Sequence, residues 1–319
     1  MQGTDMRLST MVWLFLGSMI FIALPGCDYA ERVAVRQYST ARFDAIPTLK
    51  EARKGFVTKI IAAGEPAPRV QEPLTDQLEL IEYTSPVGPL SAYVSVDPKD
   101  GQRHPAIVWI HGGDCNSLED VWTPQPREND QSAVAFRQAG IVTMYPSLRG
   151  GNKNPGRREG FYGEVDDILA ATERLASLPY VDPNRIYLGG HSTGGTMALM
   201  VAAYSNRYRA IFAFGAVASP AQYGDNYVYH DAHDVNEVAL RSPIVWLKSI
   251  QSPTYVFEGE AEGTWNTLRA MAMENKNPKV RFLRVPGHTH FTLLAPMTEY
   301  LAAQIVDDKI TVLDDAVPQ

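Results

Sequence analysis

A serine lies between closely spaced glycines in the run Gly190-His191-Ser192-Thr193-Gly194. The short run 185–189 before it is typical of a buried strand, and the apolar run 196–203 after it consists of good helix formers. In a tight turn from strand to helix a serine adopts a strained backbone, and residues two positions to either side must lack side chains. The hydroxyl then lies over a helix N-terminus, where free N–H groups favour developing negative charge. The spacing therefore predicts a nucleophilic Ser192 rather than a serine that only caps the helix.

A nucleophilic serine needs a base and an acidic group that orients the base, in the chain order serine, acid, histidine. Three glutamates follow the predicted strand 253–257. Glu262 is the expected acid because it lies furthest along the loop, just before the next predicted helix. Glu258 is expected to end the strand, where its carboxylate could be a buried hydrogen-bond acceptor. Glu260 is expected to be solvated.

Two histidines follow the last predicted strand, 280–285. His290 is the expected base because it comes shortly before the predicted helix 293–299, whereas His288 is either a loop residue or a partner of the base. Both the acidic and the histidine segments leave the carboxyl ends of strands. They are therefore expected at the same edge of the sheet as Ser192.

A fully apolar run, 106–110, predicts a central parallel strand that leads into His111 and two glycines. Glycines at such a place let backbone N–H groups approach a substrate oxygen, so Gly112 and Gly113 are expected in an oxyanion hole. The N–H of Thr193, directly after the serine, is the second expected donor. Which residue of the loop donates is left open, and an ordinary glycine turn is the alternative reading.

Three segments together, 166–171, 178–186 and 190–195, resemble the catalytic domain of the prolyl oligopeptidase group of α/β hydrolases. They also resemble the related dienelactone hydrolase-like esterases. The resemblance covers roughly Leu78 to Val306. It implies an α/β-hydrolase fold and a serine hydrolase.

The same resemblance implies a triad of Ser192 as nucleophile, His290 as base and Glu262 at the acid position. The chain departs from the family in two ways. The acid is usually an aspartate, and this loop offers only glutamates. The large N-terminal propeller of the oligopeptidases is absent from this sequence, which favours an esterase over a peptidase.

The N-terminus carries an almost unbroken apolar run, Met11 to Leu24, that ends in Leu24-Pro25-Gly26-Cys27. This pattern resembles a bacterial lipoprotein signal, in which Cys27 is lipidated and becomes the mature N-terminus. A cleaved secretory signal without lipid and an uncleaved anchor are the alternatives. We therefore expect a protein of the bacterial cell envelope, anchored to a membrane and facing the periplasm or the exterior.

The composition, with 45% hydrophobic and 20% charged residues, is that of one globular domain. We expect a signal peptide at 1–27, a tether and helical segment at 28–77 and a catalytic domain at 78–319. A net charge of −7 without a basic run argues against nucleic-acid binding. Cys115 is expected to be a small buried thiol outside any disulfide.

The predicted catalytic domain begins with a hairpin at the sheet edge, 78–83 with 90–96. Six further strands then alternate with helices: 106–110, 141–145, 186–188, 210–214, 254–257 and 280–285. This alternation predicts a doubly wound, mostly parallel eight-stranded sheet with helices on both faces. Upstream, 43–63 is expected to form one or two helices interrupted by Pro47. Their apolar residues are expected to dock on the domain: Leu49, Phe56, Ile60 and Ile61.

Two loops could define the substrate. The cations of 148–158 could bind a substrate anion, although an arginine paired with Glu164, Asp166 or Asp167 explains them equally well. The segment 219–240 is read as a polar lid or cap; its cluster 230–234 lacks a recognised metal-ligand spacing. No metal site and no cofactor are predicted.

An esterase acting through an acyl-enzyme on Ser192 is the leading hypothesis. A serine peptidase of the oligopeptidase group is the second, with a short peptide as substrate. A non-catalytic envelope lipoprotein that uses the fold as a scaffold is the distant third.

Overall fold

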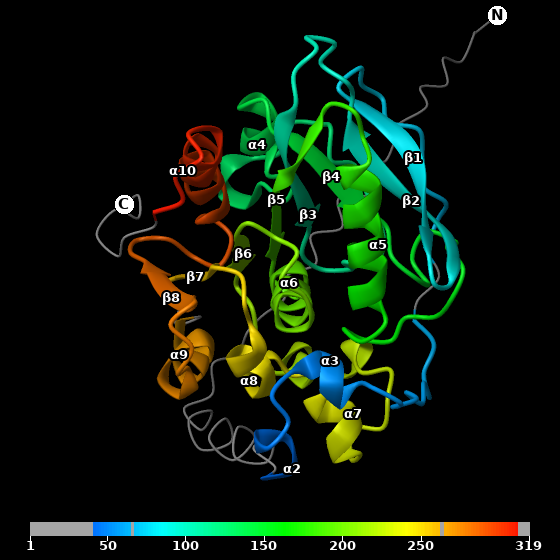
Figure 1. The fold of residues 1–319 in the computed structure, drawn as a ribbon, viewed down its shortest axis with the longest axis vertical. Helices are drawn as coiled ribbons and strands as arrows, with labels where there is room; N and C mark the ends of the chain where they lie inside the picture. Colours follow the sequence, from blue (N-terminus) through cyan, green and yellow to red (C-terminus); the bar gives the residue numbers. More distant parts are fainter. Residues whose placement is uncertain (1–40, 65–66, 262–264, 312–319) are drawn as a thin grey trace, which may run out of the picture.

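The computed structural model describes residues 41–64, 67–261 and 265–311. At its centre is an eight-stranded sheet in the order β1-β2-β4-β3-β5-β6-β7-β8 (Figure 1). The strands have these bounds: β1 Leu78–Ser85, β2 Gly88–Ser95, β3 His104–Ile110, β4 Val142–Pro146, β5 Val181–His191, β6 Ile211–Phe214, β7 Thr254–Gly259 and β8 Val280–Val285. The hairpin β1–β2 is antiparallel and pairs antiparallel with β4, while all other neighbours are parallel. The predicted sheet is confirmed.

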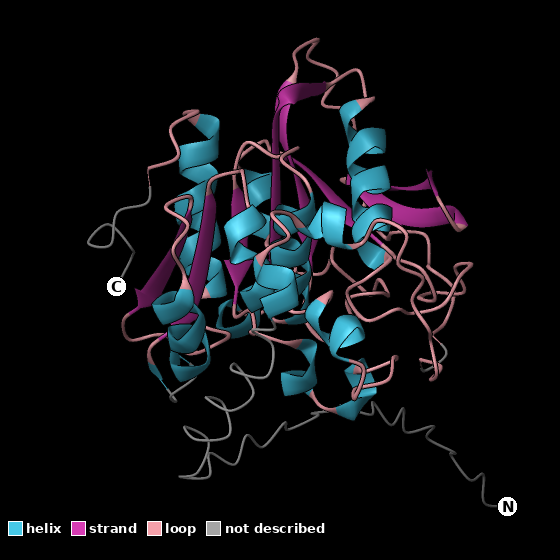
Figure 2. Ribbon diagram, turned by 60° about the horizontal axis from the view of Figure 1, so that its bottom comes forward, coloured by secondary structure: helices cyan, strands magenta, loops and turns pink. Residues whose placement is uncertain are grey.

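Successive side chains of each central strand lie on opposite faces of the sheet, and both faces are buried. Ala106, Val108 and Ile110 of β3 belong to one apolar core, whereas Ile107 and Trp109 belong to another on the opposite face. Helices α5 (Glu164–Ala176) and α6 (Thr193–Tyr204) cover the first face. Helices α4 (Val134–Gln138) and α10 (Leu294–Val306) cover the second (Figures 1 and 2). The remaining long helix, α9 (Trp265–Glu274), lies between β7 and β8 in the chain.

The segment before the sheet forms two short helices, α2 (Ala41–Asp44) and α3 (Leu49–Ala52). Phe43 and Leu49 are buried in the core beside α6, so this segment docks on the domain as predicted. The expected apolar stripe is only partly correct, because Ile61 is 60% exposed. Ile61 instead uses its backbone N–H, which donates to the carbonyl of Tyr229 at 2.8 Å.

The predicted cap segment 219–240 folds against this N-terminal stretch. It contains the short helices Pro220–Tyr223, Asp225–Tyr227 and α7 (Val235–Ala239), followed by α8 (Pro243–Trp246) and the turn Leu247–Ser249. Glu237 of α7 accepts hydrogen bonds from the Thr58 hydroxyl at 2.8 Å and the Lys59 N–H at 2.7 Å. Ile60 forms a β-bridge with His230. The N-terminal stretch therefore fixes the outer side of the cap segment.

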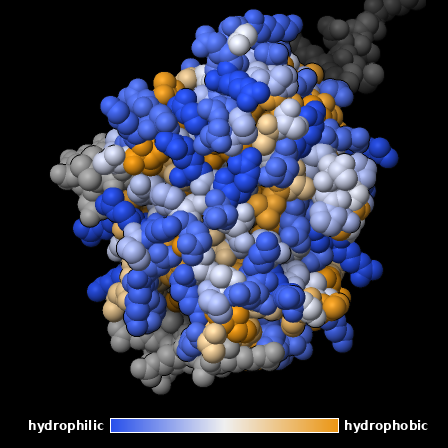
Figure 3. Space-filling view, in the orientation of Figure 1, coloured by the Kyte–Doolittle hydropathy of each residue, from blue (hydrophilic) through white to orange (hydrophobic). Residues whose placement is uncertain are grey.

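The surface drawn in Figure 3 is mostly hydrophilic, with apolar side chains in small scattered groups. None of the helices in the described ranges is long and apolar enough to span a bilayer. The predicted signal peptide, including Cys27, lies outside the described residues.

Candidate active site

Ser192 lies at the turn from β5 into α6, with the backbone at φ 54° and ψ −114°. A non-glycine residue in this region is strained, and such strain is concentrated at functional sites. The flanking glycines are required sterically: a Cβ on Gly190 would collide with the Gly194 carbonyl, and a Cβ on Gly194 with the Ile110 carbonyl. The sharp turn expected from the glycine spacing is therefore present.

His290 is brought to the serine by the end of β6. The Ser192 N–H donates to the Phe214 carbonyl at 2.7 Å. The next residue, Gly215, has no room for a side chain because the His290 ring lies against it. The predicted nucleophile and the predicted base therefore border two consecutive residues, Phe214 and Gly215, although they are far apart in the sequence.

The carboxylate that contacts His290 belongs to Glu258. Its Oε2 lies 3.1 Å from His290 Nδ1, and its Oε1 accepts the N–H of Gly259 at 2.8 Å. Glu258 is buried at the end of β7 and His290 is 17% exposed. The expected acid, Glu262, lies outside the described residues. Glu260 is exposed and pairs with Arg284 at 2.9 Å, in agreement with its expected solvation.

The glycine that follows Glu258 shows how this carboxylate reaches the histidine, but the sequence could not reveal it, because Gly263 follows Glu262 in the same way. A Cβ on Gly259 would collide with the backbone of His288 and Thr289, so this glycine lets the end of β7 approach the histidine loop. Sequence reasoning placed the acid further along the loop instead. His288 itself does not reach the carboxylate: its Nδ1 lies 3.3 Å from the Thr292 hydroxyl.

The loop after β3 lies beside the N-terminus of α6. The hydroxyl of Thr193 donates to the Gly113 carbonyl at 2.9 Å, which ties the loop to the helix. The N–H of Gly112 already donates to Gln131 Oε1 at 2.9 Å, so this predicted oxyanion donor is engaged. No hydrogen bond among the described residues uses the N–H of Gly113 or of Thr193. These two N–H groups remain the available donors.

His191, next to the serine, is fully buried and its ring centroid lies 4.5 Å from that of His290. Burial and the neighbouring His290 hold the pKa of His191 well below its ordinary value. His191 Nε2 contacts the His290 carbonyl at 2.8 Å, and Nδ1 contacts the Gln131 amide. Sequence reasoning gave neither His191 nor Gln131 a role, because their partners come from other strands and loops.

The Tyr223 side chain borders the nucleophile, and the Cys115 side chain lies beside Thr193. The Tyr223 hydroxyl is 2.7 Å from the Thr196 hydroxyl and close enough to the Ser192 side chain to interact with it. Cys115 is a free buried thiol, as predicted, and burial raises its pKa to about 12. A thiol that stays protonated at neutral pH is a poor nucleophile, so Ser192 has no competitor in Cys115.

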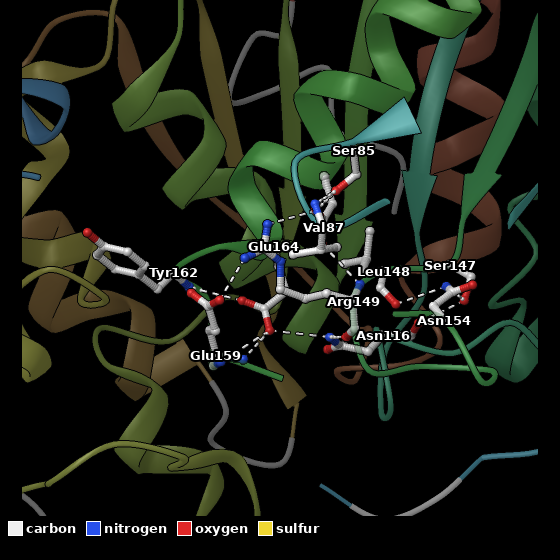
Figure 4. A network of polar contacts seen from close by, with 12 residues as sticks. Ser85, Val87, Asn116, Ser147, Leu148, Arg149, Asn154, Glu159, Tyr162 and Glu164 are labelled. Carbon is white, nitrogen blue, oxygen red and sulfur yellow. Dashed lines mark hydrogen bonds and ion pairs between the residues drawn. The ribbon is translucent and has the colours of Figure 1, made fainter. Parts of the chain in front are cut away.

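Two of the four cations in the loop after β4, Arg149 and Arg158, are paired with carboxylates of the protein. Arg149 donates from Nε and Nη2 to Asp167 at 2.8 and 2.9 Å. Its Nη1 donates to Glu159 at 2.7 Å (Figure 4). Burial alone would lower the pKa of Arg149, but the hydrogen bonds and charge of Asp167 raise it above its ordinary value. Of the two readings of this loop, pairing with a buried carboxylate is the correct one for Arg149.

Arg158 from the same loop forms a bidentate pair with Asp114, which directly follows the two oxyanion-loop glycines. Its Nη2 also donates to the Ser117 hydroxyl at 3.2 Å. This ion pair braces the far end of the oxyanion loop. Among the described residues, no cluster of three or more histidine, cysteine or acidic side chains could hold a metal ion.

With this geometry in view, comparison with known proteins identifies the family. The model of the prolyl oligopeptidase family matches residues 128–292, just over half of the chain. The chain belongs to the prolyl oligopeptidase family. The match begins in the turn before α4 and ends just after His290, so it includes Ser192 and Glu258.

The chain is also similar to a curated protein and to solved structures. The chain is 23% identical over 209 residues to the uncharacterized peptidase YuxL of Bacillus subtilis, covering 59% of this chain and 31% of that one. The structure of acylaminoacyl peptidase from Pyrococcus horikoshii matches with a TM-score of 0.56 and 14% identity, over 75% of this chain and 43% of that one. A hyperthermophilic esterase from Pyrobaculum calidifontis matches with a TM-score of 0.52 and 17% identity, over 88% and 94%. These identities show the α/β-hydrolase fold alone, and this family member spans about a third of YuxL.

Proposed function

We propose that this prolyl oligopeptidase family member is a serine hydrolase that cleaves an ester or amide bond through an acyl-enzyme on Ser192. The observation that carries the proposal is the 3.1 Å contact between His290 Nδ1 and the buried Glu258 carboxylate, beside a strained serine. A carboxylate can only accept, so His290 carries its proton on Nδ1. Nε2 is then left with a lone pair for the serine proton. Glu258 thus takes the role first expected of Glu262.

In the acylation step, Ser192 Oγ attacks the substrate carbonyl carbon while its proton passes to His290 Nε2. Glu258 stabilises the imidazolium that forms, because its charge lies on the opposite side of the ring. The carbonyl oxygen gains negative charge and accepts hydrogen bonds that the N–H groups of Gly113 and Thr193 donate. The proton on Nε2 then passes to the leaving alcohol or amine as its bond to the carbonyl carbon breaks.

Deacylation repeats these steps with water in place of the leaving group. His290 Nε2 takes a proton from water, and the resulting hydroxide attacks the acyl carbonyl carbon. The same two N–H groups stabilise the second oxyanion. Ser192 Oγ leaves with the proton from Nε2, which releases the carboxylic acid and restores the free serine.

We favour an ester substrate, and a short peptide is the second candidate. The Pyrobaculum esterase supports the first choice, since the chain aligns with 94% of its length. The family match and the similarity to YuxL support the second. Acyl esters and aminoacyl amides differ in leaving group rather than in the acyl-enzyme, so the same serine serves both.

A substrate panel tests the proposal directly. The purified protein should react with a fluorophosphonate probe at Ser192 and release a chromophore from short acyl esters. Rates for aminoacyl amides and for esters with the same acyl group then show which substrate class the protein hydrolyses faster. The Ser192→Ala variant is the matched control, and its labelling to the same extent as wild type would refute the serine assignment.

We further propose that Cys27 carries a lipid that anchors the protein to a bacterial membrane, on the strength of the sequence pattern at its N-terminus. Cys27→Ser should move the protein from the membrane fraction to the soluble fraction. A Cys27→Ser protein that stays with the membranes would show that Met11 to Leu24 acts as an uncleaved anchor instead.

A further inference from the structure

A partly buried chain of hydrogen bonds joins the oxyanion loop to the histidine loop. The Gly112 N–H donates to Gln131 Oε1 at 2.9 Å, Gln131 Nε2 lies 2.9 Å from His191 Nδ1, and His191 Nε2 lies 2.8 Å from the His290 carbonyl. We propose that Gln131 and His191 are positioning residues that hold the oxyanion loop and the His290 loop in register for the reaction. This inference rests on the hydrolase proposed above.

Elementary hydrogen-bond chemistry fixes the direction of this relay. A carbonyl can only accept, so His191 Nε2 carries a proton and donates to the His290 carbonyl. In the neutral ring Nδ1 is then an acceptor and needs a donor from Gln131. The Gln131 amide oxygen is also 3.1 Å from Nδ1, but it already accepts the Gly112 N–H, so the amide nitrogen is the donor.

The other hydrogen bonds of Gln131 agree with this orientation. Its amide nitrogen has a second proton, which it donates to Asn129 Oδ1 at 2.7 Å. Its backbone carbonyl accepts the Trp109 indole N–H at 2.8 Å, which fixes the residue to the end of β3. Every polar atom of the amide is therefore used, and a flipped amide would set its NH₂ against the Gly112 N–H. The low pKa of His191 keeps the ring in the neutral form that the relay needs.

The relay acts where small displacements matter. The Gly113 N–H, a proposed oxyanion donor, lies between two anchored groups: Gly112 N–H held by Gln131, and Gly113 carbonyl held by the Thr193 hydroxyl. At the other end, the bond to the His290 carbonyl fixes the backbone that carries the base. These two halves of the site come from the loops after β3 and β8. A displacement of about 1 Å among reacting groups can lower the rate by about 10²-fold.

Paired substitutions test the relay. Gln131→Met keeps the side-chain length and removes all of the side-chain hydrogen bonds of Gln131. His191→Phe keeps a ring against His290 but removes both ring hydrogen bonds. Each should lower kcat on an acyl ester by about 10- to 100-fold, with KM within about threefold. Because the two residues act in one chain, the double variant should be within about twofold of the worse single variant.

Tyr145→Phe is the matched control. It removes one buried hydrogen bond, which the Tyr145 hydroxyl donates to the Ser132 carbonyl at 2.7 Å. Ser132 is the residue next to Gln131 and is not part of the relay. Its kcat should stay within about twofold of wild type. An equal loss in Tyr145→Phe, multiplied losses in the double variant, or unchanged kcat in both single variants would overturn the proposal. Melting curves confirm that each variant is folded.

If either apolar variant does not fold, Gln131→Glu decides the matter. Its carboxylate accepts the Gly112 N–H but cannot donate to neutral His191, so the relay is broken at one known link. The expected loss in kcat is again about 10- to 100-fold, and a normal kcat overturns the relay. A wild-type protein that neither hydrolyses esters nor is labelled at Ser192 would instead overturn the proposed function, and the relay with it.

Discussion

Glu258 and Asp167 are both buried carboxylates beside a basic side chain, but their surroundings differ in one respect. Asp167 accepts four hydrogen bonds: three from Arg149, including its backbone N–H, and one from the Ser85 hydroxyl. Glu258 accepts one from the Gly259 N–H and one from His290. Arg149, the partner of Asp167, also donates a hydrogen bond to Glu159. No hydrogen bond within the described residues uses His290 Nε2.

A fully satisfied buried ion pair holds a structure together and has no capacity left for a ligand. Where a buried carboxylate binds only one ring nitrogen of a histidine, the other ring nitrogen stays available for proton transfer. Residue type and burial alone thus do not separate a structural carboxylate from the one that we propose to be catalytic. The two carboxylates differ instead in how many hydrogen-bonding atoms of the neighbouring basic side chain have no partner in the protein.

The largest expected effect is at the nucleophile. Ser192→Ala should lower kcat by about 10⁶-fold, because no other group can form the acyl-enzyme. The rate of chromogenic ester hydrolysis measures the loss. Activity within tenfold of wild type in a folded Ser192→Ala protein would contradict the serine mechanism and the catalytic side of the comparison.

The second effect separates the glutamates. Glu258→Gln should lower kcat by about 10³- to 10⁴-fold with the fold intact, since it removes the charge that stabilises the imidazolium. Glu260→Gln and Glu262→Gln are the matched controls and should retain near-normal turnover. Collapse of activity in Glu262→Gln, with a well-folded and active Glu258→Gln, would return the acid to the position first expected from the sequence.

The third effect concerns stability instead of rate. Asp167→Asn should lower the free energy of unfolding by about 3 kcal/mol, because it leaves the buried Arg149 without its main counter-charge. Turnover per folded molecule should stay near wild type. Glu173→Gln, which breaks an exposed pair with Arg207, should cost less than about 1 kcal/mol. Equal losses in the two variants, measured by denaturant unfolding, would remove the distinction drawn for the buried pair.

A fourth effect is a dependence of stability on pH. Burial, followed by the charge of Arg241, lowers the pKa of His230 from 6.5 to about 4. Below pH 6.5 the unfolded chain binds a proton that the folded protein does not. This contribution to stability is therefore complete above pH 6.5 and is lost as the pH falls toward 4. His230→Gln should flatten the pH dependence of unfolding between these values, by at most about 1.4 kcal/mol per pH unit. An unchanged difference between wild type and variant across this range would show that His230 titrates normally.

The parts of the site that depend on local chain geometry were predictable. The strained turn at Ser192 follows from glycine spacing, and the histidine was placed by the strand before it and the helix after it. The eight strands followed from apolar runs and their alternation with helices. Strand ends were less predictable: β5 extends from Val181 through His191, well beyond the short apolar run that indicated it.

The parts that depend on which loops meet were not predictable. Glu258, Gln131 and Arg158 find their partners across 32, 60 and 44 residues of sequence. Nothing in a linear sequence distinguishes Glu258, Glu260 and Glu262 by their distance from His290. The close approach of Gly259 to the histidine loop decides it, and this approach exists only once β7 and β8 are paired.

The sequence by itself determined the fold class, the turn that carries Ser192 and the edge of the sheet where the other groups gather. These depend on backbone sterics and on the burial of apolar side chains, both of which act over a few neighbouring residues. Only the tertiary structure decided which carboxylate contacts His290, which arginine is saturated and which N–H groups stay free for an oxyanion. These depend on hydrogen bonds between distant segments, whose geometry is set when the sheet and its loops are packed together.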